Sequence, residues 1–331
     1  MKMKFYSLFG ALALVTCSCN NQKQDDQVIS QRHIHKYGYA VSADEWNMNN
    51  YPGQVITALR SGVTITSSYE NGVLHGPCTR TFPNSQIVES YTLYNQGTPV
   101  KEVSYDNKAM PVRERIQLSP TRHALTLWYD SGTPLSVEEY ANDELLEGQY
   151  FTIHNEIEAR VEKGHGKRVI RDQHGLLLAR EEIKQGFVAK KETFYASGTP
   201  ETVSYYVRGK LHGERSTFLE TGEPLTIEEW VAGNLHGKST YFKNGTRIAE
   251  VSYLNGLRNG VETQYLDGEK ISQQIFWEND RKHGIATYFV DGEPQFEHYY
   301  AGELVSKKQY DEQMRMDEMI SQISPELRVN R

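Results

Sequence analysis

The chain has 331 residues, of which 24% are charged, and its formal net charge is −7. This acidic balance argues against a nucleic-acid partner, which needs a basic patch. The 21 tyrosines indicate a thin sheet rather than a thick aliphatic core, with each ring packed on a neighbour and its hydroxyl in water.

Residues 1–19 are predicted to be a signal peptide. A basic start precedes the apolar run Phe5–Val15, which is too short to span a bilayer permanently. The segment Leu14–Cys19 resembles the lipobox of bacterial lipoproteins, whose cysteine is acylated. The resemblance implies an exported protein tied to an envelope membrane, inner or outer, with the lipid on Cys19 or alternatively on Cys17; cleavage without lipid is the other interpretation.

Residues 20–50 are interpreted as a polar tether followed by an N-terminal cap. The segment Asn20–Gln31 is polar, and His33–Tyr51 is rich in aromatic residues and lacks the repeat found later. His33 and His35 are two residues apart, so on a strand both would point to the same face, as two metal ligands could. This spacing alone is weak evidence for a metal site. Away from the lipobox only Cys78 remains, so no internal disulfide is predicted and Cys78 is expected to be a packed thiol.

Residues 51–304 are predicted to form a repeat array. Turn glycines recur at intervals of 23 or 24 residues, and the clearest are Gly198, Gly222, Gly245, Gly268 and Gly292. Short runs of β-branched and aromatic residues lie between turns, with no gap long enough for a crossover helix. The array is therefore expected to be all-β, an elongated antiparallel meander of hairpins.

Two features of the repeat concern local geometry and binding. Asn244-Gly245 and Asp267-Gly268 are expected to supply the positive φ angles of tight hairpin turns. An aromatic residue stands eight positions after each turn glycine, and these form the candidate binding surface: Tyr206, Trp230, Tyr253, Phe276 and Tyr300.

The unit Tyr241–Gly260 resembles the MORN repeat, in the bacterial variant grouped under YwqK-type antitoxin proteins. The resemblance implies a hairpin-repeat fold and suggests an antitoxin or immunity role. Some MORN proteins of other cell types bind anionic lipids, which the net charge of −7 disfavours here.

No catalytic, cofactor or metal site is predicted. His75, His212, His236 and His283 each precede a turn glycine, but no third ligand converges on them. Glu138-Glu139 and Glu228-Glu229 are neighbours on strands, so each pair points to opposite faces and is interpreted as a solvated face rather than a catalytic dyad.

Residues 305–331 are predicted to form a C-terminal helix and tail. Ser306–Ile323 lacks Gly and Pro and carries an imperfect apolar stripe at helical spacing. The helix is expected to cover the open last strand, with partner binding as the alternative.

Three functions are consistent with these patterns. The first is a non-enzymatic, lipid-anchored scaffold that binds a protein or a glycan. The second is the antitoxin role implied by the family resemblance. The third is an envelope enzyme, which no catalytic arrangement of residues in the sequence supports.

Overall fold

The computed structural model describes residues 26–323. The chain divides into two compact units, Met1–Met110 and Pro111–Arg331. The predicted signal peptide, including Cys17 and Cys19, lies outside the described residues.

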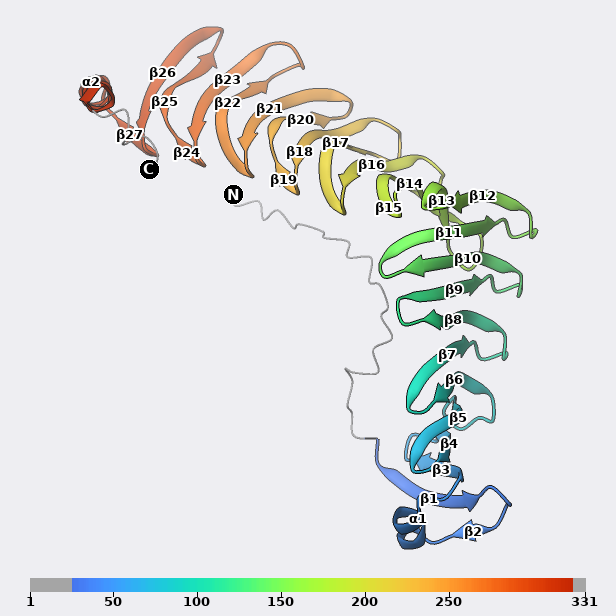
Figure 1. Ribbon diagram of the computed structural model, residues 1–331. Coiled ribbons are helices and arrows are strands. Elements are labelled where there is room, and N and C mark those ends of the chain that lie inside the picture. The colour runs from blue at the N-terminus through green and yellow to red at the C-terminus, as the bar shows by residue number, and fades with distance from the viewer. Residues whose placement is uncertain (1–25, 324–331) are drawn as a thin grey trace. The chain divides into compact units, whose positions relative to one another are not determined.

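The first unit is an antiparallel meander with one short helix (Figure 1). Its strands are β1 (Val28–His35), β2 (Ala40–Val41), β3 (Gly53–Leu59), β4 (Thr64–Glu70), β5 (Val73–Thr81), β6 (Val88–Asn95) and β7 (Thr98–Tyr105). From β3 to β7 each strand pairs with the next one along the chain, whereas β1 pairs with both β2 and β3.

The segment expected to cap the first strand contains a helix that the sequence analysis did not predict, α1 (Ala43–Asn49). Ser42 and Glu45 form a capping box at its start, the Ser-x-x-Glu spacing that favours helix initiation. The helix buries Trp46, whose ring lies 5.3 Å from the His33 ring and 6.1 Å from the Tyr69 ring. His33 is thus a packed residue of the cap.

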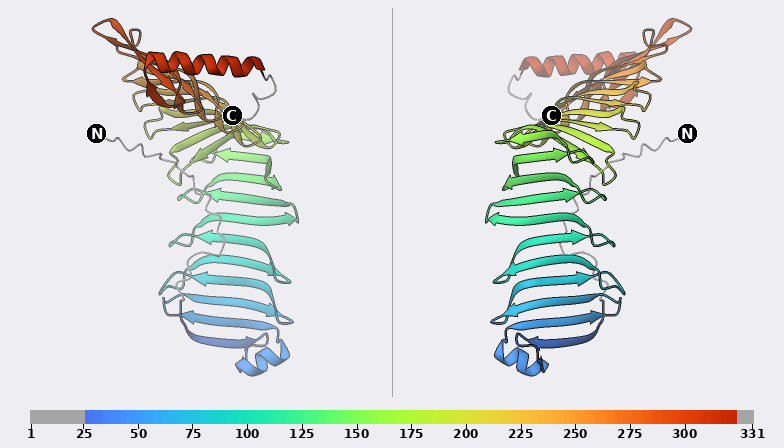
Figure 2. Two further views of the ribbon diagram at one scale, coloured as in Figure 1. Left: turned by 90° about the vertical axis from the view of Figure 1, so that its left-hand side faces the viewer. Right: turned by 90° about the vertical axis from the view of Figure 1, so that its right-hand side faces the viewer.

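The second unit is also an antiparallel meander. Its strands are β8 (Pro111–Ser119), β9 (Arg122–Trp128), β10 (Pro134–Ala141), β11 (Glu144–Phe151), β12 (Ile157–Glu162), β13 (His165–Arg171), β14 (Leu177–Lys184), β15 (Phe187–Phe194), β16 (Pro200–Val207), β17 (Lys210–Phe218), β18 (Pro224–Val231), β19 (Asn234–Leu235), β20 (Gly237–Lys243), β21 (Thr246–Leu254), β22 (Leu257–Tyr265), β23 (Ile271–Glu278), β24 (Arg281–Lys282), β25 (Gly284–Val290), β26 (Glu293–Tyr300) and β27 (Glu303–Val305). Strands β19 and β20 are two segments of one interrupted strand, since both pair with β18. Strands β24 and β25 are likewise two segments that both pair with β23. Within this unit the strands lie side by side in one layer (Figure 2), so the all-β meander expected from the repeat is confirmed.

The turns explain the glycine repeat. Asn244 and Gly245 both have positive φ, 51° and 72°, as a tight hairpin turn requires. At the next turn the expectation was wrong for Asp267: only Gly268 of that pair has positive φ (83°), and Leu266 N–H reaches Lys270 O across a longer turn. This turn therefore holds one more residue than the Asn-Gly turn.

The predicted C-terminal helix is present as α2 (Lys307–Ile323), which contacts β26. Figure 2 shows it at the C-terminal end of the second unit. The Tyr300 hydroxyl donates to Asp317 at 2.8 Å, and the rings of His298 and Tyr310 lie 5.4 Å apart. The helix therefore covers one face of the last long strand.

Candidate functional site: an aromatic row beside a buried polar network

Three of the five predicted surface residues share one face of the second unit. Tyr206 pairs across its turn with Leu211, Trp230 with Leu235, and Tyr253 with Arg258, so each occupies the same place in its repeat. We call the face that carries these three residues the aromatic face.

Phe276 and Tyr300 lie on the opposite face. Trp277, 8% exposed, pairs with Lys282 in the place that Phe276 was expected to take, while Phe276 is 41% exposed. Glu269 stands between Gly268 and the bonded residue Lys270, whereas Gly198 and Gly222 directly precede their bonded residues, so the strand after Gly268 is shifted by one residue relative to its glycine. A one-residue shift exchanges the faces of a strand.

Tyr300 is displaced for a different reason. The hairpins β20–β21 and β22–β23 each have a register shift beside the turn, whereas β25–β26 pairs without one. Tyr299 consequently takes the repeat position opposite Leu304, and Tyr300 faces α2. The corrected aromatic row of the second unit is Tyr140, Tyr206, Trp230, Tyr253, Trp277 and Tyr299.

Several members of this row donate a hydrogen bond to a glutamate on the same face. The hydroxyl of Tyr140 reaches Glu138 at 2.8 Å, and the Trp230 indole N–H reaches Glu228 at 3.0 Å. The solvated-face interpretation of Glu138 is therefore wrong, since this side chain is 2% exposed; Glu139, on the other face, pairs with Arg122. At Tyr140, Trp230 and Tyr299, the acid two residues before the aromatic residue is its hydrogen-bond partner.

Around Glu138 these contacts extend into a buried network, which we call the polar network: Glu138, Tyr140, Tyr150, Arg168, Glu181 and Lys191. Glu138 accepts hydrogen bonds from Tyr140 and Tyr150 (2.8 Å each) and from Arg168 Nε (2.7 Å). Arg168 also reaches Glu181 at 3.3 Å, and Lys191 pairs with Glu181 at 3.0 Å.

Burial sets the protonation of the network. Burial raises the pKa of the Tyr140 hydroxyl and of the Tyr150 hydroxyl, and the Glu138 carboxylate raises both further. Burial alone would lower the pKa of Arg168, but Glu138 and the tyrosine hydroxyls outweigh it, so this pKa is raised. The tyrosines are therefore neutral donors to an ion pair around neutral pH.

A pocket of about 320 Å³ opens beside this network, and we call it the Tyr206 pocket. Residues from strands between β10 and β16 and from their turns line it: Tyr140, Asp143, Leu145, Arg168, Glu181, Ile183, Gly186, Phe187, Val188, Lys191, Tyr206 and Gly209. Sequence reasoning found Tyr206 but missed Arg168 and Lys191, because nothing in the repeat spacing marks charges that meet only across strands.

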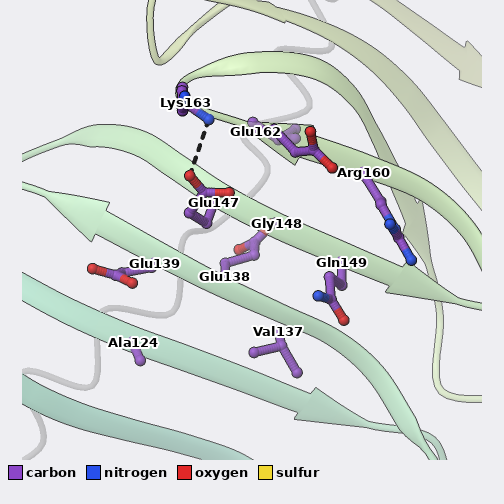
Figure 3. Close-up of a pocket in the computed structure, with 11 residues that line it drawn as sticks. Ala124, Val137, Glu138, Glu139, Glu147, Gly148, Gln149, Arg160, Glu162 and Lys163 are labelled. Carbon is purple, nitrogen blue, oxygen red and sulfur yellow. Dashed lines mark hydrogen bonds between the residues drawn. The ribbon is translucent and has the colours of Figure 1, made fainter.

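A second hollow, of about 390 Å³, lies around β10, β11 and β12 (Figure 3). Glu139, Glu147 and Glu162 line it together with Arg160 and Lys163, and the Lys163 backbone N–H donates to Glu147 at 3.1 Å. Across residues 26–323 no group of three or more His, Cys, Asp or Glu side chains is arranged to hold a metal ion. The acidic hollow therefore offers no chelating set.

Two of the four repeat histidines accept hydrogen bonds from the backbone of the next turn. His75 Nδ1 accepts from Gln96 N–H, and His283 Nδ1 accepts from Ala301 N–H, both at 3.3 Å. Cys78 is half-buried, with its Sγ 3.3 Å from Ser67 Oγ. These residues hold neighbouring strands together.

The fold and this surface define a repeat-sheet protein, and comparison with known proteins gives the repeat a name. Three segments, 66–87, 229–247 and 276–293, match the family model described as the MORN repeat. The chain thus contains MORN repeats in both units.

No curated protein matches the chain. Among solved structures, a mutant of S. aureus TarM in complex with Fondaparinux, alpha-GlcNAc-glycerol and UDP is 8% identical, covering 38% of this chain and 21% of that one. Its TM-score of 0.19 carries no argument about fold or function. Neither described helix is long and apolar enough to cross a bilayer.

Proposed function

We propose that this chain is a non-enzymatic, lipid-anchored protein of the bacterial envelope whose repeat sheet binds a protein or a glycan. The observation that carries the proposal is the aromatic row, which from β16 to β26 sets one large ring per repeat on one face of the sheet. Aromatic residues contribute disproportionately to binding energy, and a repeat array presents them at regular intervals.

The partner contacts the aromatic face, because α2 covers part of the opposite face at the C-terminal end of the sheet. The test is in-cell crosslinking followed by capture of the full chain. Trp230→Ala with Tyr253→Ala should remove the captured partner. Val231→Ala with Leu254→Ala, on the same strands but on the opposite face and about 40% exposed, should leave it in place. Equal capture by both double variants would contradict the proposal.

Membrane attachment is tested separately. Cys19→Ala should release the chain from membranes in detergent-free fractionation, and Cys17→Ala should not. If neither substitution changes the distribution, the lipid anchor is wrong. Recovery of the wild-type chain in the cytosol would instead favour the YwqK-type antitoxin role.

A further inference from the structure

We propose that the Tyr206 pocket binds one ring of an uncharged saccharide. This inference rests on the proposed function and deepens it, because it assigns a ligand class to one place on the aromatic face.

The pocket joins an apolar floor to aromatic walls. Ile183 and Leu145, 2% and 3% exposed, form part of the lining, with Tyr140 and Tyr206 beside them. Its volume of about 320 Å³ lies at the lower end of the range for small-ligand sites, roughly 300–1,000 Å³. A sugar ring has an apolar C–H face and a rim of hydroxyls, so it needs both kinds of surface together.

The polar groups of the lining can exchange hydrogen bonds with hydroxyls. The Lys191 ammonium has three N–H bonds and directs one to Glu181 at 3.0 Å, and its side chain is 25% exposed. Arg168, 27% exposed, directs Nη1 to the other oxygen of Glu181 at 3.3 Å. A hydroxyl can accept from the ammonium while it donates to the carboxylate.

The charges in the lining balance. The lining holds two positive groups, Arg168 and Lys191, and two negative ones, Glu181 and Asp143. Arg168 and Lys191 are both paired with Glu181. A charged ligand would have to compete with these ion pairs, whereas an uncharged one leaves them intact. The balance therefore favours a neutral sugar over an acidic one.

The site is held in shape before any ligand arrives. The Tyr140 ring stacks on His123 with centroids 5.2 Å apart and planes 9° apart, while its hydroxyl is bonded to Glu138. Side chains already fixed by packing and hydrogen bonds lose little entropy on binding.

The strands around the pocket disfavour an extended peptide as the ligand. A peptide that binds by adding a strand needs an open sheet edge. The strands β10, β11 and β13 to β16 each pair with a neighbour on both sides. The pocket lies on the face of a continuous sheet, where side chains rather than backbone groups make the contacts.

The test measures binding of neutral oligosaccharides to the full chain in detergent solution. The probes are tri- and tetrasaccharides of glucose, galactose, mannose and N-acetylglucosamine, and their binding is measured by isothermal titration calorimetry. We expect at least one to bind, and Tyr206→Ala or Lys191→Met to weaken it by about tenfold, or about 1.4 kcal/mol. Tyr205→Ala, one residue away on the opposite face, should leave the affinity unchanged.

Two outcomes would overturn the inference: no probe binds the wild-type chain, or Tyr206→Ala and Tyr205→Ala bind equally well. Because Lys191→Met leaves Glu181 with one partner fewer and can loosen the fold, Tyr206→Phe serves as a second variant. It keeps the ring and should keep most of the affinity. If Tyr206→Ala still captures the crosslinked partner while no saccharide binds, the saccharide site is refuted and the scaffold function stands.

Discussion

Replacement of Arg168 by methionine should destabilise the middle of the second unit far more than the loss of an ordinary surface arginine. Arg168 makes two contacts with Glu138, at 2.7 and 3.2 Å, and one with Glu181 at 3.3 Å. Without it, the carboxylate of Glu138, 2% exposed, keeps only the two tyrosine hydroxyls as partners.

The magnitude follows from this burial. Removing one partner of a buried ion pair costs roughly 3–5 kcal/mol, because the remaining charge stays buried without compensation. Lys191 still pairs with Glu181, so the penalty falls mainly on Glu138 and should lie near the lower value. The matched control is Arg122→Met, which removes the partner of Glu139 on the opposite face; Arg122 is half exposed, so its loss should cost less than about 1 kcal/mol.

Hydrogen exchange measured by mass spectrometry suits this test better than a single melting temperature, because repeat arrays can open locally. In Arg168→Met, peptides from β10 to β15 should lose protection, while peptides from β20 to β26 should match the wild type. Equal loss in Arg168→Met and Arg122→Met, or uniform loss along the array, would refute the assignment of the network as a local structural centre.

Three further expectations concern pH and backbone geometry. Because the fold raises the pKa values of Tyr140 and Tyr150, their contribution to stability is fully present below the ordinary tyrosine pKa of about 10 and is lost as the pH rises above it. An absorbance titration at about 295 nm should therefore show two or more tyrosines that ionise late or only on unfolding. The pKa of Asp280, lowered by hydrogen bonds from Arg258, gives the opposite sign, so Asp280→Asn should reduce stability slightly at neutral pH and not at about pH 2, as judged by urea unfolding. Gly260→Ala should lower the free energy of unfolding by about 1–2 kcal/mol, more than Gly198→Ala. Both glycines have positive φ, but a Cβ at position 260 would lie 3.1 Å from Ser252 Cβ, whereas position 198 has open space around it. Equal unfolding midpoints for the two variants would contradict this expectation.

The spacing of glycines predicted the fold because a turn is a local property. Asn244-Gly245 needs only its own two residues to adopt positive φ, and the strands between such turns then have no partner but each other. The helix α2 could be predicted for the same reason, since its formation depends on local sequence and Ser306–Ile323 contains no helix breaker. The short α1 was missed although Ser42 and Glu45 carried its capping signal.

The site was harder to predict because it depends on register. A count of eight residues from each turn glycine placed Tyr206, Trp230 and Tyr253 together, but the extra turn residue near Gly268 put Trp277 rather than Phe276 on the aromatic face. Arg168 reaches Glu138 from a strand 30 residues later. Contacts of that kind depend on which strands are neighbours and on their register, neither of which a repeat period alone determines.

A sheet of one layer makes the same side chains serve stability and binding. Trp230 packs in the aromatic row and donates its indole N–H to Glu228, so Trp230→Ala removes a packing surface, a hydrogen bond and a candidate ligand contact at once. Trp230→Phe separates these roles, because it keeps a ring on the face and removes only the donor. In this variant Glu228 still has Arg215 as its partner, at 3.0 Å. If the row binds its partner through ring surfaces, Trp230→Phe should therefore retain binding. Loss of binding without loss of stability would mean instead that the partner recognises the polar groups between the rings.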